Sequence, residues 1–139
     1  MLLLDTHVWL WSADGDRRRV GRRARQILDR AEARHDIRIS AVAIFEVTAL
    51  HTLGRLRLAR SLEQWVHDSL DAAGVRIAEL TPAIALDAGS IPRTALADPL
   101  DRLLVATARQ LDAVFLTADA RILEYAARTR NVRVQNAGA

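Results

Sequence analysis

Four acidic residues that lie far apart in the sequence stand where an α/β fold could bring them together: Asp5, Glu46, Asp101 and Asp119. Each follows an expected strand or lies on a helix beside one, and such positions gather at one edge of a parallel sheet. Four carboxylates about 6 Å apart would repel one another by on the order of 15 kcal/mol at an effective dielectric constant near 20. A divalent cation offsets this repulsion most directly, because Mg²⁺ and Mn²⁺ prefer oxygen ligands. The set therefore predicts a metal-dependent phosphodiesterase.

Each acid also has a purely structural explanation. Asp5 and Asp119 could each cap the helix that begins beside them. The segment that starts at Asp98 fits a variant of the capping box in which Asp101 is the third helical residue. Glu46 lies among apolar residues, so it occupies either a solvated stripe of its helix or a position aimed at a partner. Only the convergence of the acids separates the two explanations.

Three further residues are candidates for accessory roles. Thr117, two residues before Asp119, could donate a hydrogen bond to a carboxylate or to a metal-bound water. Thr6, which follows the first acid directly, is an accessory candidate as well. Arg102 could contact a scissile phosphate or pair with Asp98, and the sequence does not choose between these roles.

The apolar pattern predicts an α/β fold. Short apolar runs predict strands at residues 2–4, 37–39, 75–80, 113–116 and 132–134. Amphipathic stretches and cap signals predict helices at 6–11, 20–33, 42–53, 61–73, 83–88, 98–111 and 119–128. Strands that alternate with helices predict a three-layer α/β/α domain, in which a short central parallel sheet of about five strands is covered on both faces.

Length and composition indicate a single globular domain over residues 1–139. A chain of 139 residues can bury one sizeable core, and its 50% hydrophobic and 27% charged residues are typical of globular proteins. No apolar run approaches the roughly 20 residues needed to cross a bilayer. The apolar start at residues 1–4 is interrupted by Asp5 and lacks the basic flank of a secretory signal. We therefore expect a cytoplasmic protein that does not enter a membrane.

All of the 20 basic residues are arginines, and the net charge is +3. The absence of lysine excludes P-loop nucleotide hydrolases and Schiff-base enzymes, since both classes need a lysine amine. Arginines cluster at residues 17–25 with no acid among them. This cluster could bind RNA or an acidic partner, because guanidinium groups suit phosphate and carboxylate recognition, or it could be an ordinary solvated surface.

Four sequence blocks resemble the PIN-domain ribonucleases, and in particular the VapC-type toxins of bacterial toxin–antitoxin pairs. The blocks are LLDTH at residues 3–7, SAVAIFE at 40–46 with LGRL at 53–56, DPLDRLL at 98–104 and FLTAD at 115–119. Each block is weakly specific alone. Together they occur in the family's order and span nearly the whole chain.

The resemblance implies a PIN-like fold and a toxin that is an Mg²⁺- or Mn²⁺-dependent endoribonuclease. Asp5, Glu46, Asp101 and Asp119 would be the metal-binding, catalytic acids, with Asp98 a possible fifth carboxylate. A cation held by carboxylates lowers the pKa of a bound water and stabilises the attacking and leaving oxygens at phosphorus. RNA phosphodiester hydrolysis then needs no nucleophilic side chain.

The resemblance also implies protein partners. A VapB-like antitoxin would wrap the toxin and place a basic side chain in its acidic groove. A homodimer is implied as well, formed through helices of the first half such as those around Ile27 and at residues 42–53. With the antitoxin the assembly would be a heterotetramer or larger.

Two other functions compete with this hypothesis. An aspartate-dependent phosphotransferase would also use an acid at the end of the first strand, but it needs a second aspartate where this chain has His7, and usually a lysine. A catalytically silent PIN-like binding module would keep the fold and use its acids only as helix caps. The second alternative requires that the acids bind no metal.

Overall fold

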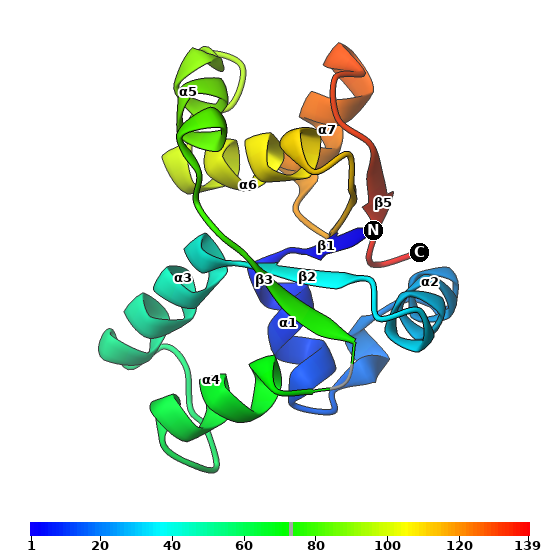
Figure 1. Cartoon of the computed structure of the whole chain (residues 1–139), viewed down its shortest axis with the longest axis vertical. Helices are drawn as coiled ribbons and strands as arrows, with labels where there is room; N and C mark the ends of the chain where they lie inside the picture. Colours follow the sequence, from blue (N-terminus) through cyan, green and yellow to red (C-terminus); the bar gives the residue numbers. More distant parts are fainter. Residues whose placement is uncertain (73) are drawn as a thin grey trace.

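Five short parallel strands form the central sheet of the protein (Figure 1). The computed structural model describes residues 1–72 and 74–139. The strands are β1 (Leu2–Leu4), β2 (Ile37–Ser40), β3 (Val75–Ala78), β4 (Val114–Thr117) and β5 (Val134–Asn136). Their order across the sheet is β3-β2-β1-β4-β5, and all neighbouring pairs are parallel. This confirms the predicted sheet.

Helices cover both faces of the sheet, as the alternation of elements predicted. On one face lie α1 (Thr6–Ala13), α2 (Arg22–Ala33), α3 (Ala41–Thr52) and α4 (Leu62–Leu70). On the other lie α5 (Pro82–Ser90), α6 (Pro99–Gln110) and α7 (Ala120–Thr129). A 3₁₀ turn, η1 (Arg17–Arg19), leads from α1 towards α2. The architecture is therefore the expected three-layer α/β/α arrangement.

The side chains of β1 alternate between two hydrophobic cores. Leu2 and Leu4 pack in the core beside α1, whereas Leu3 packs in the core beside α6 and α7. This follows from the two-residue period of a strand, which points successive side chains to opposite faces. All three residues are buried. A strand buried on both faces has a continuous apolar sequence, which is why this one was recognisable.

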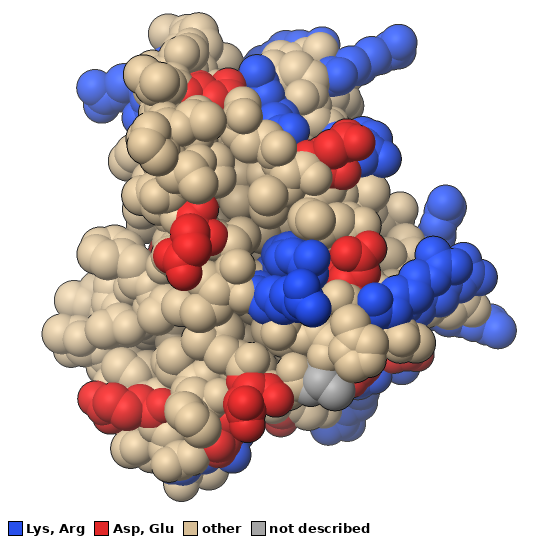
Figure 2. Space-filling view, viewed as in Figure 1, with Lys and Arg blue, Asp and Glu red and all other residues tan. Residues whose placement is uncertain are grey.

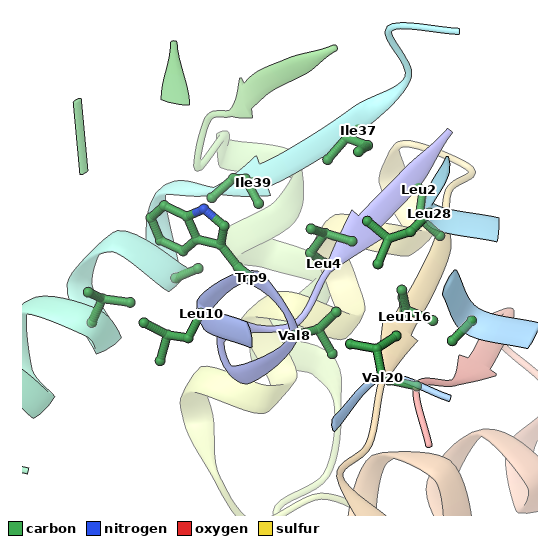
Figure 3. Packing of buried hydrophobic residues seen from close by; sticks show 14 of the residues in the cluster. Leu2, Leu4, Val8, Trp9, Leu10, Val20, Leu28, Ile37, Ile39 and Leu116 are labelled. Carbon is green, nitrogen blue, oxygen red and sulfur yellow. The ribbon is translucent and has the colours of Figure 1, made fainter. Parts of the chain in front are cut away.

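Two tryptophans fix the position of α1 beneath the sheet. Trp9 of α1 and Trp65 of α4 are both buried, with ring centroids 4.9 Å apart and ring planes tilted by 50°. Tilted aromatic pairs of this kind are favourable beyond the area they bury. Figure 3 shows Trp9 next to Ile39 and Leu4, which project from β2 and β1. This packing holds the start of α1 at the carboxyl end of β1.

The main error of the prediction concerns the last strand, which was expected at residues 132–134 and lies at Val134–Asn136. Val132 gave the apolar signal because it is buried in the core. The hydrogen-bonded ladder, however, pairs Phe115 with Val134. Core burial and strand pairing are different constraints, and the sequence pattern reports only the first.

Other boundaries differ from the prediction by two residues or fewer, except at the end of α4. The helix expected at residues 61–73 ends at Leu70, and residue 73 lies outside the described residues. The turn η1 was not expected, and α2 begins at Arg22 because Gly21 is its N-cap. No helix in the described part of the chain is long and apolar enough to cross a membrane.

The arginine cluster at residues 17–25 covers η1 and the start of α2. Acids of α2 neutralise part of it, because Arg17 pairs with Asp29 at 3.0 Å and with Glu32 at 3.6 Å. Other arginines of the cluster are exposed, and Figure 2 shows basic side chains gathered at the right of the molecule, where Figure 1 places α2. Contact of this cluster with RNA or antitoxin stays a prediction.

Candidate active site

The candidate site lies where the chain order of the sheet reverses. From β1 the chain continues to β2 on one side, and β4 lies on the other side of β1. In open α/β sheets, ligands bind beside the carboxyl ends of the strands at such a switch point. Asp5 directly follows β1, and Asp119 follows β4. The Asp5 amide donates a hydrogen bond to the Leu116 carbonyl at 3.0 Å, which joins the two strand ends.

Asp5 is a helix cap and a buried site residue at once. Its Oδ1 accepts a hydrogen bond from the Thr6 amide at 2.8 Å, and its Oδ2 accepts one from the Thr117 hydroxyl at 2.5 Å. Burial raises the pKa of Asp5, and these two hydrogen bonds oppose that effect. Both carboxylate oxygens are therefore held in fixed positions, so the structural and functional explanations coexist for this residue.

Glu46 points from α3 towards the end of β1. The Thr6 hydroxyl donates a hydrogen bond to Glu46 Oε1 at 2.9 Å. Burial raises the pKa of Glu46, the Thr6 hydrogen bond lowers it, and the charges of Asp5 and Asp98 raise it further. Of the two explanations left open by the sequence, the geometry supports a carboxylate directed at the other acids.

Asp101 carries the clearest sign that the acids converge. It lies in the first turn of α6 and is only 9% exposed. Burial raises its pKa to about 7, assisted by the negative charges of Asp98, Asp119, Asp5 and Glu46 in that order. Acids from distant parts of the chain therefore act on one carboxyl group. Among the described residues, no hydrogen bond to the Asp101 side chain supports its role in a capping box.

Asp98 and Asp119 act as helix caps at the rim of the site. Asp98 Oδ1 accepts a hydrogen bond from the Leu100 amide at 2.9 Å. Asp119 Oδ1 accepts hydrogen bonds from the amides of Arg121 at 2.8 Å and Ile122 at 3.3 Å. The predicted caps are thus confirmed. Capping uses one oxygen of each carboxylate, so it does not prevent either residue from contributing to the site.

Thr117 connects two of the acids. Its buried hydroxyl donates to Asp5 Oδ2 and accepts a hydrogen bond from the Asp119 amide at 3.0 Å. Thr6, which directly follows Asp5, makes a similar connection through the hydrogen bond from its hydroxyl to Glu46. The sequence had indicated both threonines as accessory residues, but not these partners, because a hydrogen bond across 112 residues has no local signal.

Arg102 lies beside Asp101 and does not form the suggested ion pair with Asp98 among the described residues. Its Nε is buried and lacks a hydrogen-bond partner in that same part of the chain. The sequence pattern did not identify Arg121 and Arg128 as site residues. Both border a cleft that Asp98 and Asp101 also line. Their spacing of seven residues along α7 was the available signal, since it places both on one helix face.

The donor set suits a hard divalent cation, although its side chains do not yet surround an ion. All donors are carboxylate oxygens, and burial together with their mutual repulsion raises the pKa of Asp101 to about 7. Within residues 1–72 and 74–139, no three His, Cys, Asp or Glu side chains stand ready to hold a metal.

The family of the chain follows from its sequence and agrees with its fold. The family model described as "PIN domain" matches residues 2–128, so the chain belongs to this family. A curated relative, Ribonuclease VapC22 of Mycobacterium tuberculosis (strain ATCC 25618 / H37Rv), is 32% identical over 122 residues. The match covers 87% of this chain and 88% of that protein.

Several solved structures share the fold. A chain of VapBC2 from Rickettsia felis, bound to a promoter DNA fragment, has a TM-score of 0.66 and 14% identity, covering 97% of each chain. A chain of DNA-bound VapBC from Salmonella typhimurium has a TM-score of 0.66 and 18% identity, covering 97% of this chain and 96% of that one. A chain of FitAcB from Neisseria gonorrhoeae has a TM-score of 0.63 and 23% identity, covering 98% of this chain and 97% of that one. At sequence identities this low, the similarity establishes a shared fold and nothing further.

Proposed function

We propose that this PIN-domain protein is a metal-dependent endoribonuclease and the toxin of a toxin–antitoxin pair. The observation that carries the proposal is that hydrogen bonds of Thr6 and Thr117 join the segments of Asp5, Glu46 and Asp119 at the switch point of the sheet. A relative that shares 32% of its residues over most of both chains bears the name ribonuclease. We further propose that residues 1–139 act as one domain, since β1 and β5 belong to one sheet, and that the protein works in the cytoplasm.

Asp5, Glu46, Asp101 and Asp119 are the proposed metal-binding and catalytic residues, with Asp98 as an additional carboxylate. Divalent-metal dependence is general among ribonucleases of this family. Mg²⁺ or Mn²⁺ is our proposal for this chain, because the donors are hard carboxylate oxygens and the sequence contains no cysteine.

The protein's own residues prepare the site in three ways. Thr117 and Thr6 hold Asp5 and Glu46 in place, which reduces the reorganisation needed when a ligand arrives. Because the pKa of Asp101 is raised to about 7, a metal ion competes with a proton for this carboxylate near neutral pH. When bound, a divalent ion supplies Lewis acidity for hydrolysis of an RNA phosphodiester by water.

The proposed partners are RNA, a VapB-like antitoxin and a second copy of the chain. The neighbouring structures of VapBC and FitAB were solved as toxin–antitoxin complexes, which supports an antitoxin partner. Phe45 on α3 is 62% exposed, and Leu53, which caps the carboxyl end of α3, is 67% exposed. Large exposed apolar side chains favour a protein interface, so α3 is a better candidate for the homodimer contact than Ile27, which is half-buried against the core.

The silent binding module remains the second candidate, and one observation favours it. Asp5, Asp98 and Asp119 all cap helices, so the fold alone gives each of them a use. Such a module would bind partners through the same surface without cutting RNA.

Cleavage of total bacterial RNA by the purified protein separates the two candidates. We expect cleavage that EDTA stops and added Mg²⁺ restores, and that Asp5→Asn abolishes. Asp14→Asn, at an exposed position after α1, is the matched control and should cleave like the wild type. Cleavage that persists in EDTA, or equally in Asp5→Asn, would contradict the proposal.

A further inference from the structure

A small cleft of about 150 Å³ adjoins the acidic site. Asp98 and Asp101 line one side of it, and Arg121, Glu124, Tyr125 and Arg128 of α7 line the other. The cleft therefore places two guanidinium groups next to two of the acids proposed to bind metal. Neither the ligand set nor the fold requires arginines at this position.

The two arginines lie on one face of α7, seven residues and about 10.5 Å apart along the helix axis. Both are exposed. Arg128 donates one hydrogen bond through Nη2 to the Ala95 carbonyl at 3.0 Å, which fixes its side chain against the loop before α6. A guanidinium carries five N–H donors, so most of its capacity is unused.

In the described structure these two arginines have no acidic partner, whereas Arg60, Arg109 and Arg133 each pair with an aspartate. Among the described residues, neither Arg121 nor Arg128 forms an ion pair. Glu124 lies between them on α7, three residues from one and four from the other, a spacing that permits helical ion pairs. It nevertheless pairs with neither in the described structure. By contrast, Arg109 is committed to Asp87 at 3.0 Å.

We propose that Arg121 and Arg128 bind phosphates of the RNA strand next to the scissile bond. The inference rests on the proposed ribonuclease function. It adds the path of the RNA strand, which would run from the acids along α7. Guanidinium groups match phosphate oxygens in charge and geometry, and they contact any base sequence equally well. The arginines line the same cleft as Asp98 and Asp101, so an RNA strand that is cut at the acids would place a neighbouring phosphate beside them.

The test measures binding of a fluorescent, non-cleavable 2′-O-methyl oligouridine to the full chain in Mg²⁺, by anisotropy at several salt concentrations. The double variant Arg121→Gln/Arg128→Gln should raise the Kd at least about tenfold, as expected for loss of charged hydrogen bonds. It should also reduce the slope of log K against log salt by about 1.4, or roughly 0.7 for each phosphate that is no longer neutralised. Arg133→Gln, at the opposite end of the sheet beside Asp112, is the control and should change neither quantity.

A purely structural role for the arginines would change the melting temperature or the Mn²⁺ affinity of the double variant. Binding of Mn²⁺ by calorimetry and the melting temperature should stay unchanged in the double variant, because neither residue contacts the proposed ligands through its side chain. If the double variant has the same Kd and salt slope as the control, the inference is wrong. RNA cleavage by the wild type would in that case still support the proposed function. Weaker binding of the antitoxin with unchanged RNA binding would assign the cleft to protein instead. A wild type that neither binds nor cuts RNA would remove the proposed function and this inference together.

Discussion

Replacing Asp101 with asparagine should stabilise the metal-free protein above neutral pH. The pKa of Asp101 is raised from 3.8 to about 7, first by burial and then by the neighbouring acids. Between these two pH values the folded protein holds a proton that the unfolded chain has lost. The stability associated with that proton is therefore complete below about pH 4 and is lost as the pH rises through about 7.

The size of the effect follows from the size of the shift. A change from 3.8 to about 7 corresponds to about 4 kcal/mol as an upper bound. Water at the cleft beside Asp101 screens part of this, so we expect on the order of 2 kcal/mol. At pH 8 without metal, Asp101→Asn should exceed the wild type by that amount, or by about 8 °C in melting temperature.

Urea unfolding followed by circular dichroism, in EDTA at several pH values from 5 to 8, measures this directly. The wild type should lose stability across the range relative to Asp101→Asn, while Asp14→Asn at an exposed site should follow the wild type. Parallel curves for the wild type and Asp101→Asn would show that Asp101 does not hold the proton in the folded state. A variant less stable than the wild type at pH 8 would mean that Asp101 supports the start of α6 as a cap after all.

Three further predictions concern the same site. Added Mg²⁺ should raise the melting temperature of the wild type more at pH 8 than at pH 6, because the ion must replace the proton on Asp101; an equal shift at both pH values would count against this linkage. Asp101→Asn should abolish RNA cleavage while its circular dichroism spectrum keeps the wild-type shape, and a lost fold would support the capping role instead. Thr117→Val removes the hydrogen bonds to Asp5 and from the Asp119 amide. It should lower the free energy of unfolding by roughly 1 to 2 kcal/mol, as measured by urea unfolding, and lower the Mn²⁺ affinity about tenfold, as measured by calorimetry. An unchanged Mn²⁺ affinity would show that the threonine does not position Asp5.

The sequence was informative where local chemistry decides the structure. The apolar run Leu2–Leu4 predicted a strand buried on both faces, and Pro99 after Asp98 predicted the start of a helix. The ends of β1 and β4 then had to meet in a parallel sheet, which brought Asp5 and Asp119 to one edge. Their proximity was predictable for that reason.

Other features depend on contacts that no local pattern encodes. The bond from Thr6 to Glu46 requires the exact rotation of α3 against the end of β1, which is set by packing across the core. The cleft lined by Arg121 and Arg128 requires the distance between α7 and the loop before α6. Strand β5 was misplaced because a buried Val132 has the same apolar signal as a paired residue.

The proposed function depends on acids from separate segments of the chain binding a divalent cation jointly. Calorimetric titration with Mn²⁺ at pH 8 measures such binding in the wild type, Asp5→Asn and the control Asp14→Asn. We predict saturable heat for the wild type and the control and none for Asp5→Asn. Equal heats for all three proteins, or no heat for the wild type, would contradict joint binding and leave the acids as helix caps.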